Sequence, residues 1–209
     1  MTVTVSGQEV PDDWAERWKR FHVPVLVGGR LYVRPPWDEA PVRPGVIDLV
    51  IDPGRAFGTG SHPTTRLSLE LLLAVEVGGS FADLGCGSGV LAIAAAKLGF
   101  APVIALDSDR EAVQATSQNA GANGVALERV QRADLRRDPP PAAGTMAANL
   151  TRRLLLRLAE SIEGLPRSLI VSGLLEEELD ELADAFGVRG LRERGRLAER
   201  GWGALLLGR

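Results

Sequence analysis

The segment FADLGCGSGVLAIAAAKLG, residues 81–99, constrains the fold of this chain more than any other part of the sequence. It consists of a short apolar stretch, three glycines at positions 85, 87 and 89, and an alanine-rich stretch. Because glycine readily adopts positive φ angles, this order predicts a buried strand, a sharp turn and the start of a helix. A strand that turns directly into a helix is typical of parallel α/β sheets. The segment therefore predicts an α/β domain.

The stretches that follow residue 64 alternate between helical and strand-like patterns. This alternation predicts a mainly parallel sheet with helices on both faces. Expected helices cover 64–75, 89–98, 110–121, 152–162 and 176–186, and expected strands cover 81–84, 103–107, 126–130, 145–149, 168–172 and 203–208. The arginine-rich stretch 189–200 is expected to be a solvated surface rather than a binding patch.

The N-terminal quarter of the chain has a different pattern. A stripe of aromatic residues at helical spacing predicts a short helix over 11–23. Two short strands at 31–35 and 46–53 are expected to form a hairpin around a proline-containing loop. We therefore divide the chain into an N-terminal extension of linker helix and strands, 1–52, and a larger domain, 53–209.

The composition excludes several classes of protein. The net charge of −3 disfavours a dedicated nucleic-acid-binding domain, which usually carries a basic excess. Cys86 is the single cysteine among 209 residues, so an intramolecular disulfide is excluded and a cysteine-based zinc site would lack ligands. The chain has no apolar run near the roughly 20 residues that span a bilayer, and its first residues show no leader pattern. We expect a cytoplasmic protein with no membrane or metal partner.

The glycine-rich turn has the composition of a nucleotide-binding site. Its glycines let the backbone approach a ligand closely, and the free amides of the first helical turn point toward that ligand. Asp107 follows Gly85 by 22 positions, at the end of the next expected strand, where a carboxylate can accept both hydroxyls of a ribose. Gly85, Gly87 and Asp107 are therefore candidate cofactor-binding residues. A turn with a purely architectural role is the alternative.

Two residues favour one kind of nucleotide. Val90 stands where a dinucleotide fingerprint requires glycine or alanine, which argues against NAD or FAD and so against a NAD-dependent oxidoreductase. Asp83, directly before the turn, would repel a pyrophosphate but suits a cationic amino group, such as that of the methionine part of S-adenosylmethionine. Beyond the third strand, Asp134 or the amide of Leu135 can meet the adenine edge.

Two further segments complete the candidate site. The loop PGRAFGTGSHPTT, residues 53–65, combines glycines, hydroxyls and one aromatic ring, as expected of backbone that surrounds a ligand. Thr64 and Thr65 can cap the following helix or donate to a carboxylate. Asn149 ends the fourth expected strand and therefore faces the same crevice as Asp107. Its carbonyl oxygen can accept a hydrogen bond from an amine and orient the nitrogen lone pair toward a methyl group.

In combination, these motifs resemble the class I S-adenosylmethionine-dependent methyltransferases, and within them the PrmA family, which methylates ribosomal protein eleven of the large subunit. The resemblance rests on PGRAFGTGSHPTT, DLGCGSGVLAIAAAKLG, ALDSD, ANL and VSGLL, in this order and at similar spacing. It extends from Asp12 to Arg209 and implies the Rossmann-like, doubly wound, mainly parallel seven-stranded sheet of that class. It does not include the small N-terminal domain with which these enzymes usually hold their substrate.

The resemblance also implies roles for single residues. By match, the cofactor contacts are Thr65, Gly85, Asp107 and Asn149, with Phe57, Gly58 and Thr59 on the methionine side. The sequence thus predicts an N-methyltransferase for protein amino groups, with ribosomal protein eleven as the expected partner. A methyltransferase for another protein or a small amine, and a cofactor-binding protein without that activity, are the alternatives. We assign no general base, and His62 receives no catalytic role.

Overall fold

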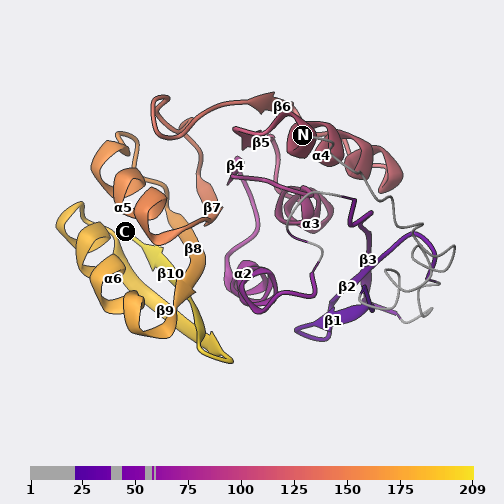
Figure 1. The fold of residues 1–209 in the computed structure, drawn as a ribbon, viewed down its shortest axis with the longest axis horizontal. Coiled ribbons are helices and arrows are strands. Elements are labelled where there is room, and N and C mark those ends of the chain that lie inside the picture. Colours follow the sequence, from indigo (N-terminus) through magenta and orange to yellow (C-terminus); the bar gives the residue numbers. More distant parts are fainter. Residues whose placement is uncertain (1–21, 39–43, 55–57, 59) are drawn as a thin grey trace, which may run out of the picture.

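The computed structural model describes residues 22–38, 44–54, 58 and 60–209, which form two sheets and the helices around them (Figure 1). The larger sheet has seven strands in the order β6-β5-β4-β7-β8-β10-β9. Its strands are β4 (Phe81–Leu84), β5 (Val103–Asp107), β6 (Arg129–Arg132), β7 (Thr145–Asn149), β8 (Ser168–Leu175), β9 (Arg192–Glu199) and β10 (Trp202–Gly208). Strands β4 to β8 pair in parallel, and β10 lies antiparallel to both β8 and β9. The expected mainly parallel seven-stranded sheet is confirmed.

The helices cover both faces of this sheet, as expected of a doubly wound fold (Figure 1). They are α2 (Pro63–Ala74), α3 (Val90–Leu98), α4 (Arg110–Ala122), α5 (Arg152–Ser161) and α6 (Leu179–Val188), with a short 3-10 turn, η1 (Glu176–Glu178), before α6. Successive strand residues point to opposite faces, so Phe81 packs with α2 and α3 whereas Ala82 packs with α5 and α6. Both faces of the sheet are therefore hydrophobic core.

The smaller sheet corrects the predicted strand pairing. It contains β1 (Val25–Val27), β2 (Leu31–Arg34) and β3 (Ile47–Val50). The two predicted strands pair in parallel rather than as a hairpin, and the hairpin joins β1 to β2. The reason is the turn after Val27, where the φ angles of Gly28 and Gly29, 55° and 68°, suit a tight hairpin connection of three residues. The predicted helix over 11–23 lies almost wholly outside the described residues.

Two further segments also differ from the sequence-based expectation. The third strand of the larger domain lies at Arg129–Arg132 rather than 126–130. The stretch 189–200, expected to be a solvated surface, contains strand β9, whose side chains are mostly exposed because β9 is an edge strand paired only with β10. Charged side chains on an edge strand hinder pairing with other chains, which explains a strand without an apolar pattern.

Of the helices described, none has the length and apolar character to cross a bilayer.

Candidate active site

A cavity of about 960 Å³ opens beyond the carboxyl ends of β4, β5 and β7. Parallel α/β sheets place their ligands at this edge because the loops from neighbouring strands meet there. Five of the predicted site residues line the cavity: Gly85, Gly87, Asp107, Asp134 and Asn149. The other lining residues are His62, Thr64, Ser108, Ala133, Leu135, Arg136, Leu150, Thr151, Arg153, Leu154, Arg157, Gly173 and Trp202.

The glycine-rich turn needs its glycines for two separate reasons. Gly85, Gly87 and Gly89 have φ angles of 78°, 53° and 82°, in the left-handed region that side chains disfavour. A Cβ atom at Gly85 would also lie 2.3 Å from Cδ2 of Leu150, closer than any van der Waals contact allows. The left-handed backbone therefore favours glycine at all three positions, and a side chain at position 85 would also displace Leu150.

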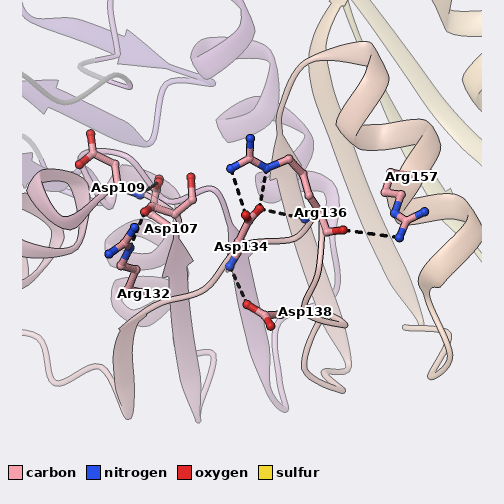
Figure 2. Close-up of polar contacts among 8 residues, drawn as sticks. Asp107, Asp109, Arg132, Asp134, Arg136, Asp138 and Arg157 are labelled. Carbon is pink, nitrogen blue, oxygen red and sulfur yellow. Dashed lines mark hydrogen bonds and ion pairs between the residues drawn. The ribbon is translucent and has the colours of Figure 1, made fainter.

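Asp107 is fixed at the end of β5 by two backbone amides. Its Oδ2 accepts a hydrogen bond from the amide of Gly87 at 2.9 Å. Its Oδ1 accepts one from the amide of Asp109, also at 2.9 Å (Figure 2). Because a carboxylate oxygen can accept more than one hydrogen bond, both oxygens retain capacity for a ligand. The carboxylate is thus oriented before a ligand binds.

The carboxylate of Asp134 is engaged by a neighbouring arginine. Nε and Nη2 of Arg136 donate to its two oxygens at 2.8 and 3.0 Å, as Figure 2 shows. These hydrogen bonds hold the pKa of Asp134 below its usual value. Leu135 also lines the cavity, so both groups predicted for the adenine edge belong to residues at the cavity.

Thr65 and Asp83 lie beneath the cavity rather than in its lining. Each is 1% exposed, and the Oγ1 atom of Thr65 and the Oδ1 atom of Asp83 have no hydrogen-bond partner within the described part of the chain. The other oxygen of Asp83 accepts from the amide of Ala92 at 3.0 Å. Burial, opposed by this hydrogen bond and reinforced by the charge of Asp107, raises the pKa of Asp83 to about 7. Buried polar atoms without partners are rare, and such an atom can be completed by water or a ligand, or relieved by protonation.

Gly58 is held against the glycine-rich turn. Its carbonyl oxygen accepts a hydrogen bond from the hydroxyl of Ser88 at 2.7 Å, and its φ angle is 100°. Phe57 and Thr59, the other predicted residues of this loop, lie outside the described residues.

Asn149 lines the cavity at the end of β7, and sequence reasoning missed the residue that makes room for it. Gly173 in β8 has a φ angle of 88°, and a Cβ atom there would lie 3.1 Å from Oδ1 of Asn149 and 2.3 Å from the carbonyl oxygen of Leu150. The side chain of Asn149 makes no hydrogen bond to any other described residue, so its amide is available to a ligand. Gly173 stands in the VSGLL motif, but nothing in the sequence shows that β8 passes this close to Asn149.

His62, not a threonine, caps helix α2. Its Nδ1 accepts a hydrogen bond from the amide of Thr64 and lies 2.8 Å from the hydroxyl of that residue. The predicted caps Thr64 and Thr65 are therefore inside the helix, because Pro63 occupies its first position. Desolvation and the charge of Arg66 lower the pKa of His62, which favours the neutral ring. The ring also lies edge-on to Trp202, with 4.9 Å between the centroids.

The fold is that of the class I methyltransferases. A crystal structure of the ribosomal protein L11 methylase from Lactobacillus delbrueckii subsp. bulgaricus superposes with a TM-score of 0.80 at 29% identity, over 90% of this chain and 98% of that chain. The tRNA (uracil-54, C5)-methyltransferase of Pyrococcus abyssi, in complex with S-adenosyl-L-homocysteine, gives 0.56 at 22% identity, over 79% of this chain and 42% of that chain.

Residues 2–209 match the family model of the ribosomal protein L11 methyltransferases (PrmA), and the chain belongs to this family. The ribosomal protein L11 methyltransferase of Geobacter metallireducens is 37% identical over 98% of this chain and 68% of its own length. Those of Pseudomonas putida (strain GB-1) and Pectobacterium atrosepticum are 39% and 42% identical over 87% and 83% of this chain, and over 66% and 60% of their own lengths. The chain thus spans about two thirds of these curated relatives.

Proposed function

We propose that this chain transfers a methyl group from S-adenosylmethionine to amino groups of ribosomal protein L11. The observation that carries the proposal is the convergence of Gly85, Gly87, Asp107 and Asn149, from three separate strand ends, on one cavity. Family membership supports the reaction class, and the names of the relatives support the acceptor. The location that follows for the protein is the cytoplasm, where ribosomal proteins are made.

The residues of the cavity suit the parts of this cofactor. Asp107 would accept the ribose hydroxyls. The amides of Gly85 and Gly87 already donate to the carbonyl oxygen of Leu106 and to Asp107, so these glycines would contribute close approach of the nucleoside rather than hydrogen bonds. The amide of Leu135 or the carboxylate of Asp134 would meet the adenine. The buried Asp83, with one oxygen unpartnered, would neutralise the ammonium of the methionine part.

The remaining predicted contacts belong to the methionine side. Phe57, Gly58 and Thr59 would surround it in the loop that leads to α2. The unpartnered hydroxyl of Thr65, at the start of this helix, would donate to the methionine carboxylate. A helix N-terminus favours an anion at this place.

When bound, the sulfonium supplies an electrophilic methyl group, so the protein has to align an amine with it. Asn149 would accept a hydrogen bond from the amine through Oδ1 and thereby direct the nitrogen lone pair into the cavity. The amine must lose a proton before it attacks, and we propose no side chain as the base. We further propose that residues 53–209 perform this chemistry and that residues 1–52 form an extension of the domain.

Calorimetry with S-adenosylmethionine and mass spectrometry of purified ribosomal protein L11 test this proposal. We expect one cofactor site per chain and mass increases of L11 in multiples of one methyl group. If folded protein produces no heat with S-adenosylmethionine, this compound is not the cofactor. Cofactor binding without methylation of L11 would show that L11 is not the acceptor. Methyl-labelled cofactor in a cell extract would then identify another amine.

A further inference from the structure

The side of the cavity opposite the candidate ribose site consists of segments that lie far apart in the sequence. In the sheet order, Asp107 ends β5 and Asp134 follows β6, and both strands lie on one side of β4. Asn149, Gly173 and Trp202 belong to β7, β8 and β10, on the other side. If the nucleoside occupies the β5 and β6 side, the acceptor amine must approach from the β7, β8 and β10 side.

Two aromatic rings on this acceptor side contact one another. The ring of Trp202, at the first position of β10, and the ring of His62, before α2, meet at an interplanar angle of 70°. Both line the cavity. Trp202 follows a tight turn in which Arg200 and Gly201 have φ angles of 53° and 79°. The backbone of Trp202 pairs with Leu175 and Glu199, and Nδ1 of His62 is bonded to Thr64, so the place of each ring depends on the segment that carries it.

Arg66 in α2 links these two element ends. Its Nε and Nη2 donate to Oε2 and Oε1 of Glu199 at 3.1 and 2.6 Å, at the end of β9 and three residues before Trp202. Its Nη1 donates to the carbonyl oxygen of Ser61, the residue before His62. One guanidinium group thus binds the segments that carry both rings.

This ion pair is better suited to fixing geometry than an ordinary surface pair. The side chains of Arg66 and Glu199 are 19% and 34% exposed, whereas those of Arg152 and Glu181 are 45% and 46% exposed. The hydrogen bonds from Arg66 hold the pKa of Glu199 below its usual value, so the pair stays charged at neutral pH. Two parallel hydrogen bonds between a guanidinium and a carboxylate restrict their relative orientation.

We propose that Arg66 is a positioning residue for methyl transfer, which fixes Trp202 and His62 on the acceptor side of the cavity. This inference rests on the proposed function. Arg66 is absent from the cavity lining and therefore acts through the two rings. Its loss should impair the use of the acceptor and leave the cofactor affinity unchanged, because Arg66 donates to Glu199 and Ser61 and to no residue that we place at the cofactor.

The chain contains a closely matched control for Arg66→Gln. In the smaller sheet, Nε and Nη2 of Arg34 donate to the two oxygens of Asp48, both at 2.8 Å, and its Nη1 donates to the carbonyl oxygen of Asp38. The side chains of Arg34 and Asp48 are 16% and 36% exposed. Arg34→Gln therefore removes the same set of hydrogen bonds at similar burial, away from the cavity.

The first measurement does not require activity. Indole resonances of ¹⁵N-tryptophan-labelled protein, assigned with Trp202→Phe, report the surroundings of each ring. We expect Arg66→Gln to shift or broaden the resonance of Trp202, Arg66→Lys to restore part of the change, and Arg34→Gln to leave that resonance in place. An unchanged Trp202 resonance in folded Arg66→Gln protein would overturn the proposal, whether or not the wild type methylates L11.

The second measurement is steady-state methylation of L11 together with calorimetry of the cofactor. We expect Arg66→Gln to lower kcat/KM for the acceptor about tenfold, with the cofactor Kd unchanged and with partial rescue in Arg66→Lys. A shifted Trp202 resonance with unchanged kcat/KM would overturn the positioning role. Absence of cofactor binding in the wild-type protein would instead reject the proposed function. The two failures are therefore distinguishable, because the Trp202 resonance tests the role of Arg66 without any cofactor.

Discussion

Asp107 combines two properties that are hard to obtain together at a strand end, a fixed orientation and unused hydrogen-bonding capacity. Asp107→Ala should weaken binding of S-adenosylmethionine by about 1.5–3 kcal/mol, because it removes charged hydrogen bonds to the ribose and releases the amide of Gly87. Calorimetry measures this loss. The control is Asp109→Ala: Asp109 caps α4 by accepting from the amide of Glu111, so its removal should lower stability and spare the affinity. The reverse pattern would show that Asp109 is the ribose ligand.

Asp83 should make both stability and cofactor affinity depend on pH. Its pKa rises from 3.8 to about 7 on folding, so the native state retains a proton that the unfolded state has lost over this range. The stabilising contribution of the protonated carboxyl is therefore complete below pH 3.8 and is lost as the pH rises through about 7. A cationic ligand favours the carboxylate, so the cofactor should bind more tightly above that pH than below it.

Asp83→Asn tests both effects, because the amide does not titrate. Urea unfolding and calorimetry from about pH 5 to 8 should show a weaker pH dependence of both quantities in the variant. Equal slopes in the two proteins would mean that another group is responsible.

Asn149 should act on turnover rather than on affinity. A group that aligns the amine contributes mainly in the transition state, so Asn149→Ala should reduce kcat far more than it raises the cofactor Kd. Single-turnover kinetics and calorimetry of the same protein measure the two quantities. Equal losses would reassign Asn149 to simple cofactor binding.

At the scale of elements, helix α4 connects the smaller sheet to the glycine-rich turn. Asn119 accepts from the amide of Asp52 at 3.0 Å and donates to the carbonyl oxygen of Ser88 at 2.9 Å. One turn later, Asn123 pairs with both the amide and the carbonyl oxygen of Val50, at 3.0 and 2.6 Å. Of these two asparagines, only Asn119 contacts the turn that lines the cavity, where Thr116 of the same helix also donates to the carbonyl oxygen of Gly87 at 3.0 Å.

This difference predicts separate effects for two similar substitutions. Asn119→Ala and Asn123→Ala should each cost about 1–3 kcal/mol of stability, because each leaves backbone groups without partners. Asn119→Ala should also weaken cofactor binding, whereas Asn123→Ala should not. Denaturant unfolding and calorimetry compare the two variants, and equal affinities would show that the contact from Asn119 does not support the turn.

At the scale of the molecule, the two sheets share hydrophobic core. Leu31 and Leu49 of the smaller sheet are fully buried and belong to the same cluster as Leu69 of α2 and Ile93 of α3. Leu49→Ala should therefore destabilise the protein by about 2–5 kcal/mol in one cooperative transition. A calorimetric scan with two transitions, of which only one has a lower midpoint temperature in the variant, would instead indicate that the extension 1–52 unfolds as a separate unit.

The sequence by itself determined the features that depend on neighbouring residues. The strand ending at Leu84, the turn at Gly85 to Gly89 and the strand ending at Asp107 follow from local apolar patterns and from the conformational freedom of glycine. The approach of Asn149 to the same crevice also followed, because carboxyl ends of parallel strands share one edge.

Only the tertiary structure decided which distant residues meet at the cavity. Trp202 and His62 are 140 positions apart in the sequence, and their contact depends on β10 lying beside β8 with α2 packed nearby. The parallel pairing of β2 with β3 and the removal of Asp83 from the cavity surface depend likewise on sheet order and burial. Local patterns set the conformation of a segment, whereas contacts between segments arise only when a common core is packed, and a single sequence does not display that packing.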